Sequence, residues 1–362
     1  MTPYEWTLLY NILLWIFVLI YIITSNQSLG KNGRGVYAFL LIAVVLVYIC
    51  FREIDIYFVD TVTYQEIYQE FCAFPNESMD LLSDYGFALL TYFLAPLRND
   101  RLYFIIIGCL YVLPLYFTFK DKVKDNYYVL LLLFICSFSF IGYGVNGLRN
   151  GLSTTFLICA FLNKKIVGQL FWIAIAVSMH KSALLPAAVF LLSKRFSNPK
   201  WYIYIWLICM VMTIIAHDYI GQYLGSIDLL GENDNRIEGY FNAQFDGGET
   251  GNVSFSRTGF RWDFVLYSII PIGLGLYFIT KKNFTDEMYK RLFCVYVGCN
   301  AFWLLTMYIP FNNRFAYLSW FIYPIVMSYP LLVKNNLIPN QPLRLKQMVF
   351  INYLFTFFMW IR

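Results

Sequence analysis

Residues 143–165 read YGVNGLRNGLSTTFLICAFLNKK, and one arginine, Arg149, stands there between two apolar runs. Such runs are typical of segments that cross a bilayer, where a charged side chain is costly and therefore a functional candidate. The rest of the chain has the same character, because 59% of its 362 residues are apolar and only 14% are charged. The runs lack the alternating polar positions of a spanning β-barrel. The composition therefore indicates an all-α, polytopic integral membrane protein.

About 11 to 12 transmembrane helices are expected, because several uncharged windows approach the roughly 20 residues that cross a bilayer as helix. The predicted spans are near 4–24, 36–51, 102–119, 127–143, 148–163, 166–180, 182–193, 201–217, 263–280, 292–309, 316–333 and 347–361. The short 182–193 segment could instead be re-entrant. Glu5 precedes the first apolar run and no Lys or Arg does, so a cleavable signal peptide is not expected.

Loop charges predict the orientation of these spans. Six loops (25–35, 120–126, 163–165, 193–200, 280–291 and 333–346) hold 17 of the 27 basic residues and only four acids, so their side is predicted to be cytoplasmic. The other side has two long regions. Residues 52–101 are predicted to form amphipathic helices on the membrane surface. Residues 218–262, rich in Gly, Asn and Asp, are predicted to be a loop with little regular structure.

The two faces also differ in which basic residue they use. The predicted cytoplasmic loops have thirteen Lys and four Arg, whereas the outer side has nine Arg and one Lys. Because a guanidinium grips phosphate or carboxylate with two parallel bonds, the outer face is predicted to bind anions. Five outer arginines lie at or near predicted membrane boundaries: Arg52, Arg149, Arg257, Arg261 and Arg314. Alternatively, each arginine snorkels or pairs with one of the eighteen outer acids.

Few side chains on the outer side could carry out acid–base chemistry. Asp60 and Tyr64 are four residues apart and would share one helical face. Asp60 could act as general base toward a sugar hydroxyl, or simply cap a helix that starts at Thr61. His180 ends an apolar run and could accept a proton or, when charged, bind phosphate; it could also be merely interfacial. His217 is expected to be interfacial.

Arg149 lies in the sequence GLRNG, whose glycines permit close approach of another helix or of a ligand. A helix N-terminus pointing outward at this place would suit a phosphate. Arg257 and Arg261 would share one face if helical, although Asp263 could neutralise one of them.

No metal, cofactor or nucleic-acid partner is expected. The chain has only two histidines and no C-x-x-C pattern, and its eight cysteines are interpreted mostly as small core residues. The run ENDNRIE, residues 232–238, lacks the turn glycine and ligand spacing of a calcium loop.

Five motifs in order resemble those of the EpsG-like branch of Wzy-type bacterial polysaccharide polymerases, and they cover most of residues 52–320. They are R-x(7)-D-x-x-x-Y (Arg52, Asp60, Tyr64), DYGF (Asp84 to Phe87), GLRNGLS (Gly147 to Ser153), MHKSALLP (Met179 to Pro186) and NNRFAY (Asn312 to Tyr317). The most specific are GLR and the H-x-S-A-L that follows it.

The resemblance implies a multi-pass glycosyltransferase of the bacterial inner membrane, with a GT-C-like layout and an active site facing the periplasm or exterior. Such enzymes make O-antigen, capsule or exopolysaccharide by transferring a growing glycan from undecaprenyl pyrophosphate to the non-reducing end of a lipid-linked repeat unit. Expected partners are these lipid-linked oligosaccharides, membrane lipid and a chain-length regulator of the Wzz type. Rival interpretations are an O-antigen ligase, an O-acyltransferase or a non-enzymatic transporter of lipid-linked glycans.

On this interpretation the expected catalytic residues are Arg149 and either Asp60 or His180. Arg149, with three further arginines, would bind the pyrophosphate, and Asp60 or His180 would deprotonate the acceptor hydroxyl. The expected substrate-binding residues are Arg52, Tyr64, Arg257, Arg261 and Arg314.

Overall fold

The computed structural model describes residues 1–24, 30–58, 60–217, 219, 259–308 and 312–361. Within them the chain is helical and contains no strand, so the all-α prediction is confirmed. The chain divides into two compact units. Unit 1 comprises Met1–His180 and Met327–Arg362, and unit 2 comprises Lys181–Val326.

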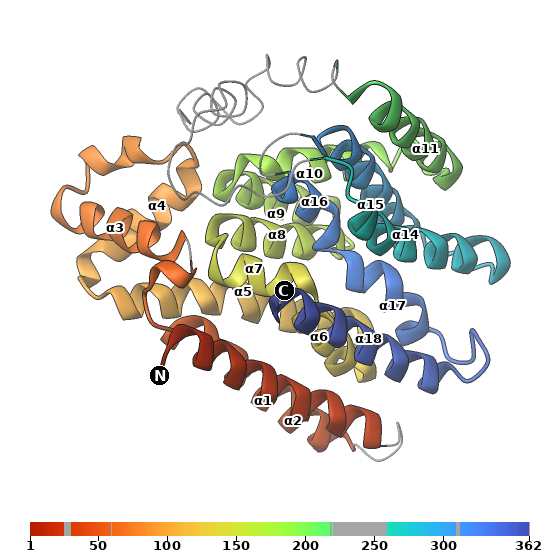
Figure 1. Cartoon of the computed structure of the whole chain (residues 1–362), viewed down its shortest axis with the longest axis horizontal. Helices are drawn as coiled ribbons and strands as arrows, with labels where there is room; N and C mark the ends of the chain where they lie inside the picture. Colours follow the sequence, from red (N-terminus) through yellow and green to blue (C-terminus); the bar gives the residue numbers. More distant parts are fainter. Residues whose placement is uncertain (25–29, 59, 218, 220–258, 309–311, 362) are drawn as a thin grey trace. The chain divides into compact units, whose positions relative to one another are not determined.

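Within the described ranges the helices follow one another with short connections (Figure 1). Unit 1 consists of α1 (Pro3–Ile23), α2 (Lys31–Phe51), η1 (Ile56–Phe58), α3 (Asp60–Ala73), η2 (Glu77–Leu81), α4 (Tyr85–Leu94), η3 (Ala95–Leu97), α5 (Asp100–Val123), η4 (Lys124–Asn126), α6 (Tyr127–Ile135), α7 (Phe138–Val145), α8 (Leu148–Phe161), α9 (Ile166–Met179) and α18 (Gln341–Ile361). Unit 2 consists of η5 (Lys181–Ala183), α10 (Leu184–Leu192), α11 (Pro199–Ile215), α14 (Trp262–Leu276), η6 (Tyr277–Lys281), α15 (Glu287–Leu305) and α16 (Asn313–Trp320). Helix α17 (Tyr323–Val333) starts in unit 2 and ends in unit 1.

Several of these helices begin at a polar side chain that satisfies free backbone N–H groups. In α1, Thr2 and Glu5 form a reciprocal capping box, with bonds of 3.2 and 2.8 Å. The Asn99 side chain accepts a bond from the Leu102 amide at 3.0 Å and so begins α5. The Asp286 side chain does the same for α15 through the Tyr289 amide at 2.9 Å.

Five helical stretches in the described part of the chain are long and apolar enough to cross a membrane, which agrees with the predicted polytopic membrane protein. They are Pro3–Ile23, Lys31–Phe51, Asp100–Ile135, Trp262–Lys281 and Asn313–Val333. Other predicted spans are shorter: α9 has 14 residues, α11 has 17, and the 182–193 segment gives the nine-residue α10. A helix that crosses a bilayer straight has about 20 residues, so each of these three helices is shorter than a full crossing.

The predicted span near 127–143 is not one helix, because the helix breaks between α6 and α7 at Cys136 and Ser137. A break inside an apolar core frees carbonyl groups that need new donors. Helix α18 supplies them: the Asn352 amide donates to the Leu133 carbonyl at 2.8 Å, and the Thr356 hydroxyl donates to the Cys136 carbonyl at 2.7 Å. The polar residues of the last helix therefore stabilise the interruption.

The region 52–101 contains the predicted amphipathic helices. In α3 the buried residues Thr61, Tyr64, Tyr68 and Phe71 recur every three or four positions and so form one face. Helix α4 likewise buries one side, while its Tyr85 is 68% exposed. These helices hold the polar residues that follow α2 close to the starts of α5 and α8.

Unit 1 has two chemically different ends. At one end, Arg34 pairs with Asp125 at 2.9 Å, and the Asn126 amide donates to the Leu332 carbonyl at 2.7 Å. These contacts bring the predicted cytoplasmic loops 25–35 and 120–126 together, next to the end of α17 that leads into the predicted cytoplasmic loop 333–346. At the other end, Arg101 donates to the carbonyls of Cys50 and Arg52, at 2.9 and 2.8 Å. The grouping of loops that charge predicted thus recurs in the packing of this unit.

The core of unit 2 is organised by Asn300, which is fully buried in α15. Its amide nitrogen donates to the hydroxyls of Ser268 and Ser319, both at 3.1 Å, and its oxygen accepts from the Trp206 indole at 2.8 Å. The Trp320 indole also donates to Ser268, at 2.9 Å. A buried network in which each member is satisfied fixes the mutual positions of its helices.

Candidate functional site

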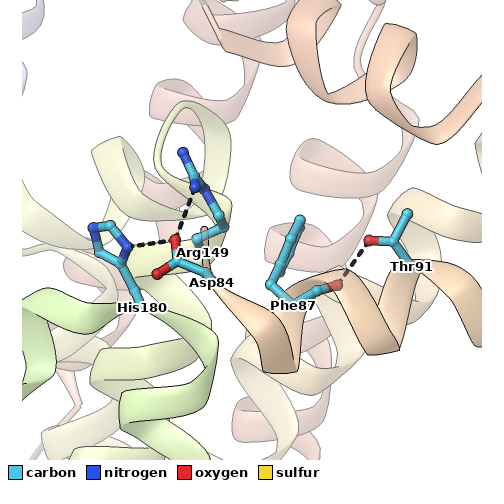
Figure 2. A network of polar contacts seen from close by, with 5 residues as sticks. All are labelled: Asp84, Phe87, Thr91, Arg149 and His180. Carbon is cyan, nitrogen blue, oxygen red and sulfur yellow. Dashed lines mark hydrogen bonds and ion pairs between the residues drawn. The ribbon is translucent and has the colours of Figure 1, made fainter. Parts of the chain in front are cut away.

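Two side chains of unit 1, those of Arg149 and His180, converge on one carboxylate oxygen of a third residue, Asp84 (Figure 2). Oδ2 of Asp84 accepts a hydrogen bond from Nη1 of Arg149 at 2.8 Å and lies 2.8 Å from Nδ1 of His180. Only 1% of the Asp84 side chain is exposed, against 29% for Arg149 and 20% for His180. The carboxylate is therefore the buried anchor, and the cation and the imidazole reach solvent.

Asp84 immediately precedes α4, where an aspartate ordinarily caps the helix. Its side chain makes no capping bond to α4 and turns instead toward Arg149 and His180. Burying a carboxylate without hydrogen-bond donors would cost roughly several kcal/mol in desolvation. The contacts with Arg149 and His180 help to offset this cost for Asp84. Asp84 is missing from the predicted catalytic residues, and its only signal in the sequence is its place in the DYGF motif.

Arg149 and His180 come from the two arms of the α8–α9 hairpin. Arg149 lies in the first turn of α8, and His180 directly follows the last residue of α9. A cation is disfavoured at a helix N-terminus, so Arg149 needs a nearby anion to remain there. The hydroxyl of Ser153, one turn further along α8, donates to the Ala176 carbonyl of α9 at 2.8 Å and ties the arms together.

A glycine allows α4 to approach this hairpin. A Cβ atom at Gly86 would lie 2.6 Å from the Ser178 Cβ and 2.8 Å from the Ser178 carbonyl carbon. Real Cβ atoms do not come this close to other heavy atoms, so only glycine lets α4 pack here against α9. Because Gly86 and Ser178 are each two residues from a site residue, their contact sets the separation of Asp84 and His180.

Replacing Gly86 with alanine is expected to push α4 away from α9 and to lower activity at least about tenfold, with a loss of stability of roughly 1–3 kcal/mol from overpacking. Adding Ser178→Gly removes part of the clash and should restore part of the activity. The control is Gly273→Ala in α14, where nothing lies within 4 Å of the added atom. Activity and thermal unfolding in detergent measure both effects, and equal behaviour of the two alanine variants would contradict the packing argument.

Tyr64 is the predicted substrate-binding residue that lies nearest this cluster. It is buried on the inner face of α3, and its ring meets that of Phe87 edge to face at 5.8 Å between centroids. Its phenol oxygen interacts with the Arg149 guanidinium. The structure therefore brings Arg149 and His180 together on Asp84, with Tyr64 beside Arg149.

Asp60 is the first residue of α3, so the helix begins at this residue and not at Thr61. Its side chain is half-buried and forms no hydrogen bond or ion pair with the described part of the chain. It stands one helical turn before Tyr64. The roles expected for Asp60, base or cap, stay predictions.

Arg52 lies in a different environment, with only 2% of the residue exposed. Its Nη1 donates to the Ile49 carbonyl, and its Nη2 donates to the Thr61 hydroxyl and the Val145 carbonyl, both at 3.0 Å. Its guanidinium also lies 5.4 Å from the centre of the Phe104 ring. These contacts join α2, α3 and the end of α7, so the geometry favours a structural function, while the predicted contact with substrate stays a prediction.

Replacing Arg52 with methionine keeps the length of the side chain but leaves the Val145 carbonyl with one donor fewer. We expect a loss of roughly 1.5–3 kcal/mol in the free energy of unfolding, the range typical of hydrogen bonds made by a charged group. The control is Arg344→Met in α18, where the arginine is exposed. If Arg52 only contacted substrate, its replacement would lower activity and leave thermal unfolding unchanged.

The remaining predicted arginines belong to unit 2. Arg261 pairs with Asp263 through two bonds, 3.0 and 2.7 Å long, and stacks 4.3 Å from the centre of the Phe264 ring. The alternative that Asp263 neutralises it is thus the arrangement found. Arg314 is exposed in the first turn of α16. Arg257 and most of the predicted loop 218–262 lie outside the described residues.

The cluster around Asp84 can hold a proton acceptor beside an anion-binding group. When Nδ1 of a neutral His180 donates to Asp84, its Nε2 is left as the acceptor. Arg149 keeps further N–H donors besides the one bonded to Asp84. Within the described residues, no group of three or more His, Cys, Asp or Glu side chains could hold a metal ion.

Comparison with known families gives a match that covers nearly the whole chain. Residues 35–362 match the model of the EpsG family. No curated protein and no solved structure matches the chain. The matched region includes Asp84, Arg149 and His180, and the resemblance carried by the five sequence motifs is confirmed. The protein therefore belongs to the EpsG family, whose members are membrane proteins similar to Wzy-type polysaccharide polymerases.

Proposed function

We propose that the protein is a polysaccharide polymerase of the bacterial inner membrane, working on the periplasmic or outer face. It would transfer a growing glycan from undecaprenyl pyrophosphate to the non-reducing end of a lipid-linked repeat unit. The observation that carries this proposal is the Asp84 oxygen shared by Arg149 and His180, each 2.8 Å away. That arrangement supports the proposal, because His180 could accept a proton beside Arg149, which could bind the diphosphate.

Glycosyl transfer from a pyrophosphate needs two kinds of help, and the cluster offers both. Nε2 of His180 takes the proton of the acceptor hydroxyl, whose oxygen forms the new bond to the anomeric carbon of the growing glycan. The bond from that carbon to the pyrophosphate oxygen breaks, and undecaprenyl pyrophosphate leaves with the electron pair. Arg149 stabilises the developing negative charge through charge-assisted hydrogen bonds.

Asp84 serves as a positioning residue in this mechanism. With 1% of its side chain exposed, it stays beneath Arg149 and His180 and holds both in place. A carboxylate on Nδ1 keeps the imidazole in the tautomer that leaves Nε2 free, as in other histidine-dependent enzymes. His180 is favoured over Asp60 as the base, because Asp60 has no orienting partner among the described residues.

The position of the cluster within unit 1 supports an active site on the outer face of the membrane. Asp84, Arg149 and His180 belong to the end of unit 1 that carries Arg101, away from the end where Arg34, Asp125 and the 333–346 loop meet. Since basic loops favour the cytoplasm, the cluster would face the opposite compartment.

Reconstitution of the purified protein with an undecaprenyl-pyrophosphate-linked repeat unit tests the proposal. We expect glycans of increasing length and one released undecaprenyl pyrophosphate for each repeat added, measured by gel and by mass spectrometry of the lipid fraction. Transfer of an acyl group, or movement of intact lipid-linked repeats across the vesicle without bond cleavage, would instead identify one of the rival functions.

A further inference from the structure

Unit 1 also contains a groove of about 880 Å³ at the surface where α5 and α9 flank the end of α8. Helix α5 forms one wall from Ile105 to Lys122, and Trp172 of α9 stands on the other side. Cys159 and Leu162, at the end of α8, complete the lining. The groove lies at the opposite ends of α8 and α9 from Arg149 and His180, so it is separate from the Asp84 cluster.

The lining is apolar over most of its length. From Ile105 to Phe117, helix α5 offers mainly aliphatic and aromatic side chains, and Phe117 is 62% exposed at the rim. Twelve residues of helix rise about 18 Å at ~1.5 Å per residue. Half the hydrocarbon thickness of a bilayer is about 15 Å, so this wall matches the depth of one leaflet.

One end of the groove is positively charged. Lys122, Lys164 and Lys165 line it together with a single carboxylate, Asp121. Lys122 pairs with Asp121 at 2.9 Å, while Lys164 and Lys165 are exposed in the turn between α8 and α9. Beside them the Asn163 side chain accepts a bond from the Lys165 amide at 2.9 Å, and its own amide nitrogen donates none within the described residues. Three cations, one anion and a free donor suit a phosphate group.

We propose that this groove binds one anionic phospholipid, with an acyl chain along α5 and the headgroup phosphate at Lys122, Lys164 and Lys165. A zwitterionic lipid would bring a second positive charge to an end that already has an excess of two. A polyprenyl chain is more than twice as long as an acyl chain, so most of it would lie outside a wall of about 18 Å.

The bound lipid would contact the α8–α9 hairpin, because α8 ends and α9 begins at the charged end of the groove. A headgroup that contacts both Lys122 of α5 and the Lys164–Lys165 turn would link that turn to α5. Bulk headgroups can also attract lysines at a helix end, so the test must separate a seated lipid from general surface attraction.

Native mass spectrometry of the full-length protein, released from micelles with equal amounts of phosphatidylglycerol and phosphatidylcholine, tests the proposal. We expect one retained phosphatidylglycerol in the unaltered protein. The double variant Lys164→Gln and Lys165→Gln should bind it roughly 30-fold more weakly, since two lysine contributions of about fivefold each multiply. The matched control is Lys281→Gln and Lys282→Gln, which removes two charges from residues outside the groove lining and should retain the lipid.

A second variant, Leu113→Trp, fills the apolar wall without changing any charge and should also reduce retention. Three outcomes would overturn the proposal: no preference for phosphatidylglycerol, an equal loss in both lysine pairs, or displacement of phosphatidylglycerol by equimolar undecaprenyl phosphate. The last outcome would show that the groove takes a polyprenyl lipid instead.

Discussion

Replacing Arg149 with alanine is expected to abolish polymer formation while the protein remains folded in the membrane. The guanidinium is 29% exposed, so removing it opens no sealed core, but the leaving pyrophosphate loses its charge-assisted donors. Loss of one preorganised donor of this kind typically costs about 10²- to 10³-fold in rate. Incorporation of repeat units by the reconstituted protein measures the effect.

Arg149→Lys separates charge from geometry. Lysine keeps the positive charge but lacks the planar fork, so we expect a partial loss, intermediate between the unaltered protein and the alanine variant. Thermal unfolding in detergent should change little for the lysine variant, because a cation still reaches Asp84. Normal polymer from Arg149→Ala would remove Arg149 from the mechanism and with it the main support for pyrophosphate binding.

Replacing His180 with glutamine is expected to lower the rate of glycan transfer about 10²- to 10⁴-fold, the range typical for loss of a general base. Glutamine retains a donor for Asp84, so the hydrogen bond between residue 180 and the carboxylate is not simply deleted. The loss should appear in kcat, while binding of a lipid-linked repeat unit stays close to normal.

The matched comparison is His217→Gln. His217 stacks on Tyr308 at 4.4 Å between ring centroids and has no place in the proposed reaction. We expect the His217→Gln variant to give a polymer yield within about twofold of the unaltered protein, since substitutions near the surface usually have small effects. If His180→Gln kept full activity and Asp60→Asn lost it, the base would be Asp60, and the assignment made from the cluster would be wrong.

Much of the architecture could be predicted because hydrophobic length and loop charge act locally. The apolar windows predicted the helices at Pro3–Ile23 and Lys31–Phe51, and basic loops predicted which connections meet in unit 1. The break between α6 and α7 could not be predicted in this way. It depends on Asn352 and Thr356, which lie more than 200 positions away in the chain. Their side chains donate hydrogen bonds to carbonyl groups at the break and so stabilise it.

Part of the candidate site could also be predicted, because its signal is local in the sequence. Arg149 and His180 stand out in the sequence as polar residues beside apolar runs, and the structure places them on one carboxylate. Asp84 does not stand out, because an aspartate before a helix is ordinarily a cap. Only the packing of α4 on α9 at Gly86 shows that its side chain serves another purpose.

The outer arginines illustrate the limit of counting one residue type. Their excess over lysine predicted a single anion-binding face, yet the described members have separate environments. Arg149 shares a carboxylate with a histidine, Arg52 is enclosed by backbone and hydroxyl acceptors, and Arg261 is neutralised by Asp263. A planar guanidinium is useful for all three tasks, so composition alone cannot distinguish them.

The α8–α9 hairpin restricts where the chain between Arg149 and His180 can change in length. A residue inserted in α8 between Arg149 and Gly151 would turn Arg149 by about 100° relative to Gly151, which packs beneath the Tyr111 ring, and would aim the guanidinium away from its carboxylate. An insertion in the turn at 163–165 would bulge outward and leave both arms in phase. Homologous chains that vary in length across this interval should therefore do so at the turn and nowhere else.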